Sequence, residues 1–205
     1  MSTKFNRQTC LLKKLNYICT MKESVVKDRI IDVASRLFYE QGYNLTGINQ
    51  IIDEAEIARA SLYNHFDSKT ELLLAYLEKA ERIWFSQLDA FLEPIADPKE
   101  KLLGLFDHRI GRQQKSGFGG CQFIKISAEV SRSETSVLEV VKDQKERLKS
   151  LISHLVKQVN HAQLLTDEQL TDMIFLLLEG GATNGAITKN SSGLVSGRVI
   201  VEKFL

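Results

Sequence analysis

The sequence has little proline and cysteine and no long hydrophobic run. Its 205 residues include only two prolines, which leaves long stretches able to form uninterrupted helices. The longest apolar run covers residues 173–178 and is far too short to span a membrane, so no membrane partner is expected. Three cysteines, Cys10, Cys19 and Cys121, form no CxxC pair, and so few of them favour a reducing, cytoplasmic location.

Signals for metal binding and catalysis are also missing. The four histidines are scattered, without an HExxH pattern, so no zinc site and no other metal is expected. A nucleophile motif and a phosphate-binding loop are absent as well. The sequence therefore predicts a protein that is not an enzyme, with no catalytic residues and no cofactor.

Basic and acidic side chains are nearly balanced in number. The chain has 27 Lys and Arg against 26 Asp and Glu, and residues 22–69 carry six basic against eight acidic side chains. A strongly basic domain is the usual footprint of nucleic-acid binding, so this balance argues weakly against that function. Binding needs only a few cations on one face, however, together with neutral donors and helix N-termini.

Hydrophobic periodicity and capping signals predict an all-α fold of about nine helices, because no strand pattern occurs. Ser68, Asp97 and Thr166 stand where they can cap the starts of helices. The expected helices cover approximately residues 22–41, two short segments within 46–66, then 68–93, 97–114, 121–130, 133–159, 166–185 and 194–205.

The segment Thr46–Phe66 is the most informative part of the chain. Apolar residues at Ile48, Ile51, Ile52 and Ala55 follow the i, i+3, i+4, i+7 spacing of one helix face, and Thr46 is placed to be the N-cap of that helix. A second short helix follows, with Leu62, Tyr63 and Phe66 able to face inward. Two short helices this close predict a helix-turn-helix, whose second helix enters the DNA major groove.

Four sequence elements occur in order between Val26 and Leu72. They are Leu37-Phe38-Tyr39-Glu40-Gln41-Gly42-Tyr43, then Thr46, Ile48, Ile51, Ala55 and Ile57, then Ser61-Leu62-Tyr63-Asn64-His65-Phe66, and last Ser68-Lys69-Thr70-Glu71-Leu72. This order resembles the DNA-binding domain of the tetracycline-repressor (TetR) family of bacterial transcription regulators. Two positions depart from the family pattern: Glu56 stands where the turn usually has glycine, and Ala58 where a Ser or Thr cap is usual.

The resemblance implies a DNA-binding surface. Arg59 and Ser61 would reach base edges, Tyr63 and His65 would contact phosphates, and Thr46 and Lys69 would clamp the backbone at two helix N-termini. With Asn64, which faces outward in the same segment, the expected DNA-binding residues are Thr46, Arg59, Ser61, Tyr63, Asn64, His65 and Lys69.

The resemblance also implies three parts of the chain. These are an N-terminal extension at 1–21, a helix-turn-helix domain at 22–67 and a helical ligand-binding and dimerisation domain at 68–205. The extension either is a basic arm that touches the DNA backbone or lies upstream of a true start at Met21, and the second alternative is favoured. It lacks the apolar stretch of a signal peptide.

The larger domain is expected to hold a small-molecule inducer. Candidate ligand-binding residues are Trp84, Phe106, His108, Phe123 and His154, with Phe85 and Phe118 also considered. An aromatic stripe at helical spacing is more often plain core, and that alternative stays open. Cys121 is either a buried structural cysteine, which is favoured, or a reactive thiol.

The last two helices would form the dimer interface. Small residues at Gly181 and Gly185, beside Leu177 and Leu178, let another helix approach closely. The alternative is that these glycines pack inside one subunit.

Together these features predict a homodimeric repressor that binds a palindromic operator in double-stranded DNA and is released by a small-molecule effector. The alternative is a helical protein-interaction adaptor without specific DNA binding.

Overall fold

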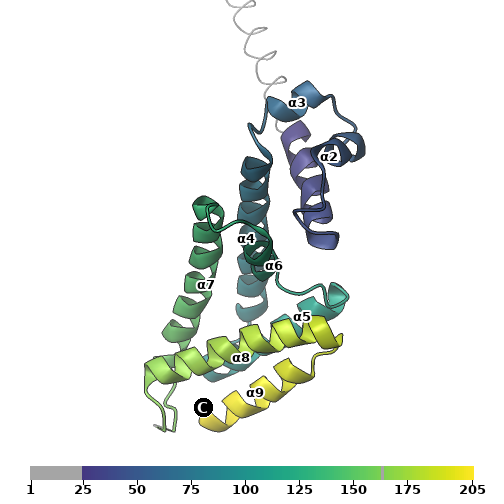
Figure 1. The fold of residues 1–205 in the computed structure, drawn as a ribbon. Helices are drawn as coiled ribbons and strands as arrows, with labels where there is room; N and C mark the ends of the chain where they lie inside the picture. The colour runs from purple at the N-terminus through teal and green to yellow at the C-terminus, as the bar shows by residue number, and fades with distance from the viewer. Residues whose placement is uncertain (1–24, 163) are drawn as a thin grey trace, which may run out of the picture. The chain divides into compact units, whose positions relative to one another are not determined.

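The computed structural model describes residues 25–162 and 164–205, and in these residues the fold is all-α, as predicted (Figure 1). The expectations for the N-terminal extension and Met21 lie outside the described residues. Residues 25–40 are helical, and no strand occurs in the described part of the chain. The other helices are α2 (Ile48–Glu54), α3 (Arg59–Tyr63), α4 (Lys69–Leu92), α5 (Pro98–Lys115), α6 (Gln122–Glu129), α7 (Thr135–Val156), α8 (Asp167–Thr188) and α9 (Ser192–Phe204).

Most of the predicted helix boundaries follow from local hydrogen bonds. The Asp97 side chain accepts a hydrogen bond from the Lys99 N–H at 3.0 Å, with Pro98 in the first turn of α5. Thr166 and Gln169 form a complete capping box at the start of α8. Gly42 has φ 97°, the left-handed conformation that a glycine accepts at the end of a helix.

The start of α4 departs from the predicted capping box in one detail. Ser68 Oγ accepts a hydrogen bond from the Glu71 N–H at 3.0 Å, as expected for a cap. The Glu71 carboxylate, however, accepts from the N–H of Asp67, one residue before Ser68, at 2.5 Å. Both bonds still satisfy N–H groups that would otherwise lack partners at the helix start.

The chain forms two compact units that divide within α4, the first ending at Tyr76 and the second beginning at Leu77. The first unit therefore extends further along the chain than the predicted boundary after Asp67. Tyr76 is buried, and its ring lies edge-on to that of Phe38 with 5.8 Å between centroids. This contact is one reason why the start of α4 belongs to the first unit.

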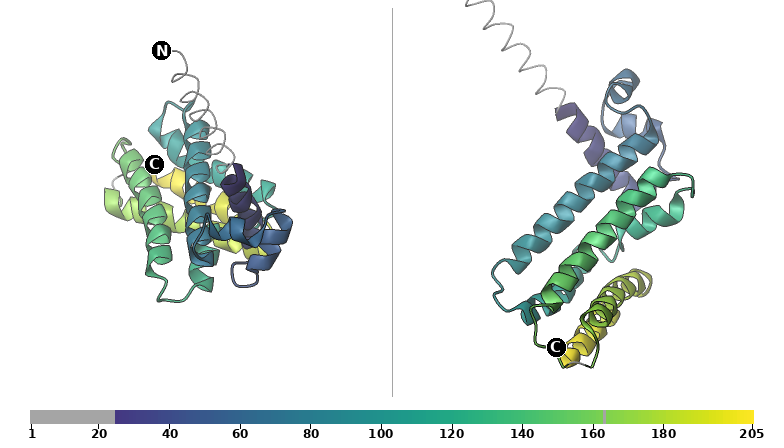
Figure 2. Two further views of the ribbon diagram at one scale, coloured as in Figure 1. Left: turned by 90° about the horizontal axis from the view of Figure 1, so that it is seen from above. Right: turned by 90° about the vertical axis from the view of Figure 1, so that its left-hand side faces the viewer.

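In the second unit, α5 packs against α7, α8 and α9, and α7 packs against α6 and α8. The helices α8 and α9 lie side by side along much of their length (Figures 1 and 2). Polar contacts also join α5 to this pair: Gln113 Nε2 donates to the Ala182 carbonyl at 2.5 Å, and Arg198 Nε lies 3.0 Å from Asp107 Oδ1. None of the described helices is long and apolar enough to cross a membrane.

Candidate functional site

The two short helices of the first unit are joined by a turn that needs a left-handed residue. Glu56 has φ 51°, in the region where a glycine is usually found and where a larger side chain costs free energy. Ala58 stands at the N-cap of α3 without a side-chain hydrogen bond. The structure therefore forms the predicted turn in spite of both departures from the family pattern.

Two buried side chains anchor α3 and leave its other face open. Leu62 and Phe66 are almost fully buried, whereas Arg59, Tyr63 and Asn64 are exposed. Tyr63, expected to face inward, is 43% exposed, so its ring and hydroxyl are available to a partner. Ser61 and His65 are half-buried beside this face. Five of the seven expected DNA-binding residues thus lie on or next to α3.

The exposed Arg59 side chain is oriented by a neighbouring helix. Its guanidinium donates a hydrogen bond to the Oδ1 atom of Asn49, an exposed residue of α2. Sequence reasoning did not single out Asn49, because the contact joins two helices and follows no local spacing. The contact holds Arg59 close to α2 at the start of α3.

Of the remaining two predicted residues, Thr46 differs from expectation. Thr46 is not the N-cap of α2, because Gly47 occupies that position and no side chain caps it. Thr46 is only 1% exposed, and its hydroxyl donates to the Gly42 carbonyl at 2.7 Å, so it supports the loop from inside. Lys69, at the start of α4, donates to the Tyr43 carbonyl at 2.6 Å and lies over the Tyr43 ring.

An ion-pair cluster offsets part of the acidic charge of this unit. Arg36 contacts the carboxylate of Glu54 on α2 and lies 3.6 Å from that of Glu40. Two of the acidic side chains counted in the sequence are therefore paired with a cation, which lowers their repulsion of a phosphate backbone.

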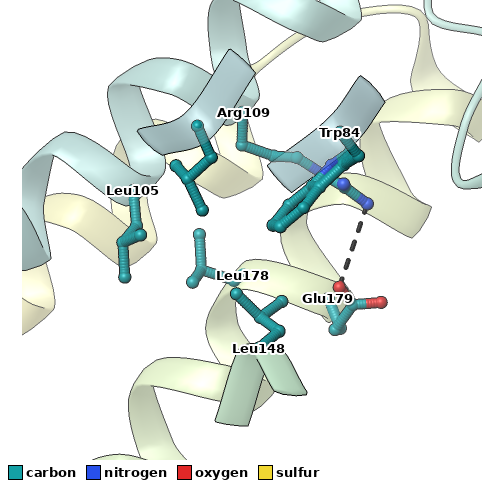
Figure 3. A pocket seen from close by; sticks show the side chains of 7 residues that line it. Trp84, Leu105, Arg109, Leu148, Leu178 and Glu179 are labelled. Atoms are coloured by element: carbon teal, nitrogen blue, oxygen red, sulfur yellow. Dashed lines mark ion pairs between the residues drawn. The ribbon is translucent and has the colours of Figure 1, made fainter. Parts of the chain in front are cut away.

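The second unit contains a small cavity between α4, α5, α7 and α8 (Figure 3). Its volume of about 10 Å³ is close to the minimum that holds one water molecule. Trp84, predicted to bind ligand, lines it together with Leu88, Leu105, Arg109, Leu148, Leu178 and Glu179.

The other predicted ligand residues do not line this cavity. Phe106 and Phe123 are fully buried in the core, which is the alternative that the aromatic spacing left open. His154 is exposed on α7. His108 is buried between the rings of Trp84 and Phe91, with centroids 6.1 and 5.4 Å away. Of the five predicted residues, the structure brings only Trp84 to the cavity wall.

Charged side chains that sequence reasoning missed lie at one edge of the cavity: Arg109 and Glu179 line it, and Lys145 of α7 contacts Glu179. Arg109 Nη2 lies 3.9 Å from Glu179 Oε1 (Figure 3). Lys145 Nζ lies 2.7 Å from Glu179 Oε2. The only sequence signal was the position of Glu179, directly after the longest apolar run. Nothing in the spacing of the three residues could indicate that they meet, because they belong to three different helices.

Cys121 adjoins the same charged edge. It is buried, and its sulfur lies 3.3 Å from Lys145 Nζ. Burial by itself raises the pKa of the Cys121 thiol, but the nearby cations of Arg109 and Lys145 outweigh that effect and the pKa is lowered. Deprotonation of the Cys121 thiol therefore costs less free energy than deprotonation of an ordinary buried cysteine.

The predicted dimer residues instead pack within one subunit. A Cβ atom on Gly181 would lie 3.0 Å from the backbone nitrogen of Leu194, at the start of α9. A Cβ on Gly185 would lie 2.6 Å from Gln113 Oε1. Leu178 belongs to the core and Leu177 packs against it. The glycines therefore allow α9 and α5 to approach α8 closely, which corrects the interface prediction for this set.

The outer faces of α8 and α9 carry a different apolar set. On α8 the exposed residues Leu176, Gly180, Thr183 and Ile187 follow helical spacing and include no charge. On α9, Val195 and Val199 are 49% and 46% exposed, one turn apart. An uncharged, partly apolar face of this kind is typical of a surface that another protein covers.

The comparisons with known proteins agree with this arrangement. Residues 30–76 match the bacterial regulatory proteins of the tetR family. An HTH-type transcriptional regulator of Lactococcus lactis subsp. lactis is 31% identical over 139 residues, which cover 65% of this chain and 65% of that protein. A second, from Mycobacterium tuberculosis, is 31% identical over 88 residues, which cover 43% of this chain and 44% of that protein.

The chain thus spans less than two thirds of the length of these curated relatives. A crystal structure of a TetR-family transcriptional regulator from Streptomyces coelicolor matches 88% of this chain and 95% of its own, with a TM-score of 0.78 and 24% identity. That likeness shows a shared fold in both units. Residues 30–76 thus match the DNA-binding domain of the tetR family of bacterial regulatory proteins, and the chain shares the fold of a TetR-family regulator.

Proposed function

We propose that this protein is a homodimeric transcriptional regulator that binds a palindromic operator in double-stranded DNA and leaves it when a small molecule occupies the second unit. The observation that carries the proposal is the arrangement of α3. Leu62 and Phe66 fix the helix to its unit, while Arg59, Tyr63 and Asn64 remain exposed side by side on the other face. Such a face suits entry into the major groove.

Each exposed group suits a particular contact. A guanidinium binds guanine O6 and N7 through two hydrogen bonds, so Arg59 is proposed to read a base. The Tyr63 hydroxyl and the His65 imidazole are proposed to donate to phosphate oxygens, and Asn64 and Ser61 to add polar contacts beside them. Lys69 supplies a cation at the start of α4, where the helix dipole also favours an anion.

Dimerisation is proposed through the exposed faces of α8 and α9 rather than through the buried glycines. A second copy paired on these faces would remove four apolar side chains from water, those of Leu176, Ile187, Val195 and Val199. A two-fold dimer also suits a palindrome, because two α3 helices must reach half-sites one helical turn or a multiple apart.

Regulation is proposed to pass along α4. This helix starts with Lys69 in the first unit and continues to Leu92, with Trp84 and Leu88 on the cavity wall. A ligand that enlarges the cavity would displace these two side chains and thus bias the position of α4. It can act as an inducer only if it binds the released form more tightly than the DNA-bound form. The setting is proposed to be the cytoplasm.

Fluorescence anisotropy with labelled DNA fragments from the regions flanking the gene tests this proposal. We expect one fragment to bind tightly in the presence of random competitor DNA, and binding to weaken as salt rises, because phosphate contacts release counterions. Equal, weak binding to every fragment would instead favour the adaptor alternative. Reporter expression with and without the gene then distinguishes a repressor from an activator.

A further inference from the structure

The cavity of the second unit has an apolar wall and a charged edge. Leucines from four helices form the wall: Leu88 of α4, Leu105 of α5, Leu148 of α7 and Leu178 of α8. Such a wall suits the hydrocarbon part of a ligand, because burial of apolar surface is favourable.

The charged edge contains two cations and one carboxylate. The side chains of Arg109, Lys145 and Glu179 are 11%, 18% and 12% exposed, so little water screens them. An anion placed beside Arg109 and Lys145 would be attracted by both cations, and the low exposure of these side chains strengthens that attraction.

A polar group on the wall also lacks a partner. The indole Nε1 of Trp84 has no hydrogen bond to any described residue, although Trp84 is only 5% exposed. Buried indole N–H groups usually donate to an acceptor, and this one belongs to a residue that lines the cavity (Figure 3). The unpartnered donor and the two cations call for the same chemistry, an acceptor with negative charge.

We propose that this cavity binds a small amphipathic monoanion, whose apolar body lies against the leucines and whose head group is held by Arg109, Lys145 and the N–H of Trp84. The cavity must widen to admit it, because its present volume is about 10 Å³. The head group competes with Glu179 for the same cations, so binding loosens the Lys145–Glu179 contact between α7 and α8. The proposal rests on the proposed function only for the effect of the ligand on DNA.

Intrinsic fluorescence tests the ligand class without DNA. Trp84 is the single tryptophan of the chain, so a change in emission reports directly on the cavity. We would titrate the full-length protein with octanoate, octanamide and octylammonium, which share one chain length and differ in head-group charge. Octanoate is expected to shift the emission with saturation and to bind about ten-fold more tightly than the other two. Equal binding of octanamide, preference for octylammonium or no saturable shift with octanoate would overturn the proposal.

Two variants that remove the same charge from α5 separate the cavity from general electrostatics. Arg109→Gln removes a cation at the cavity edge, whereas Arg112→Gln removes one that contacts Gln87 of α4 and does not line the cavity. We expect octanoate binding to weaken about ten-fold in the first variant and to remain at the wild-type level in the second. If octanoate binding weakened equally in both variants, the effect would come from the net charge of the protein and not from the cavity. Circular dichroism confirms that each variant is folded.

Failure of this proposal differs from failure of the proposed function. A protein that binds operator DNA and ignores octanoate retains its function and refutes the ligand class. A protein that binds octanoate at Trp84 and no DNA supports the ligand class and refutes the regulator. Release of bound DNA by octanoate, and not by octanamide, supports both.

Discussion

A Cβ atom on Gly185 of α8 would lie 2.7 Å from the carbonyl oxygen of Asn190, nearer than such atoms are normally found. The same Cβ would meet Gln113, whose side chain donates to the Ala182 carbonyl. The absence of a side chain at this position therefore allows the chain to turn back from α8 towards α9 and lets Gln113 reach α8.

We predict that Gly185→Ala lowers the free energy of unfolding by about 1–3 kcal/mol, because the backbone carbonyl cannot move aside as a side chain could. Gly180→Ala is the matched control, since nothing lies within 4 Å of its added Cβ. Alanine there raises helix propensity, worth about 1 kcal/mol. Urea denaturation measures both. A Gly185→Ala protein as stable as the wild type would contradict the close approach.

Glu56→Gly is predicted to stabilise the first unit. A left-handed φ costs an ordinary residue about 1–2 kcal/mol, and glycine avoids this cost. Glycine also loses more conformational entropy on folding, which reduces the gain in stability by about 0.5–1 kcal/mol. Glu56→Ala keeps the Cβ and its strain, so it controls for loss of the carboxylate. Denaturation should show a gain for the glycine variant alone. A gain of equal size in the alanine variant would attribute the effect to charge.

Arg59→Ala is predicted to relax the sequence preference of DNA binding by about 1–3 kcal/mol of discrimination, because the proposed bidentate base contact is lost. Lys69→Ala should weaken binding to all sequences alike. It should also lower by about one the slope of the logarithm of the binding constant against the logarithm of the salt concentration. Anisotropy with operator and random DNA, each over a salt series, distinguishes the two patterns. Equal losses on both kinds of DNA for Arg59→Ala would remove it from base recognition.

Acid is predicted to destabilise the second unit through His108. Burial, together with the nearby cations of Arg112, Arg109 and Lys115, lowers the pKa of His108 from 6.5 to about 4. Between these values the unfolded chain takes up a proton that the folded chain does not, so stability falls as pH falls from 6.5 towards 4.

The test compares His108→Gln with His154→Gln, a change at the exposed histidine of α7. Denaturation at neutral pH and within that window should show a smaller loss of stability for the first variant than for the wild type. The second variant should follow the wild type. If the free energy of unfolding of His108→Gln fell with pH as steeply as that of the wild type, groups other than His108 would control the loss of stability in acid.

Val199→Asp is predicted to convert the proposed dimer to monomers, because it places a charge on the exposed face of α9. Ile83→Asp, on α4, replaces a side chain that is 41% exposed against 46% for Val199 and lies outside this face. Analytical ultracentrifugation should find monomers only for the first variant. A dimer that survives Val199→Asp would require another interface.

The sequence by itself determined the helices and the helix-turn-helix, because their signals act over a few residues. Asp97 and Thr166 cap the helices that they were expected to cap. The left-handed turn at Glu56 forms where the pattern placed it. Caps and periodicity depend on hydrogen bonds and side chains within one or two turns of helix, and the linear sequence contains that information directly.

Only the tertiary structure decided which face each residue presents and which distant side chains meet. Adjacent positions on a helix point about 100° apart, so Gly181 packs on α9 while Gly180 faces outward, a difference that the glycine spacing did not resolve. Arg109, Lys145 and Glu179 come together from α5, α7 and α8 because those helices pack on one another. Contacts between helices depend on the packing of the whole unit, which no short sequence pattern contains.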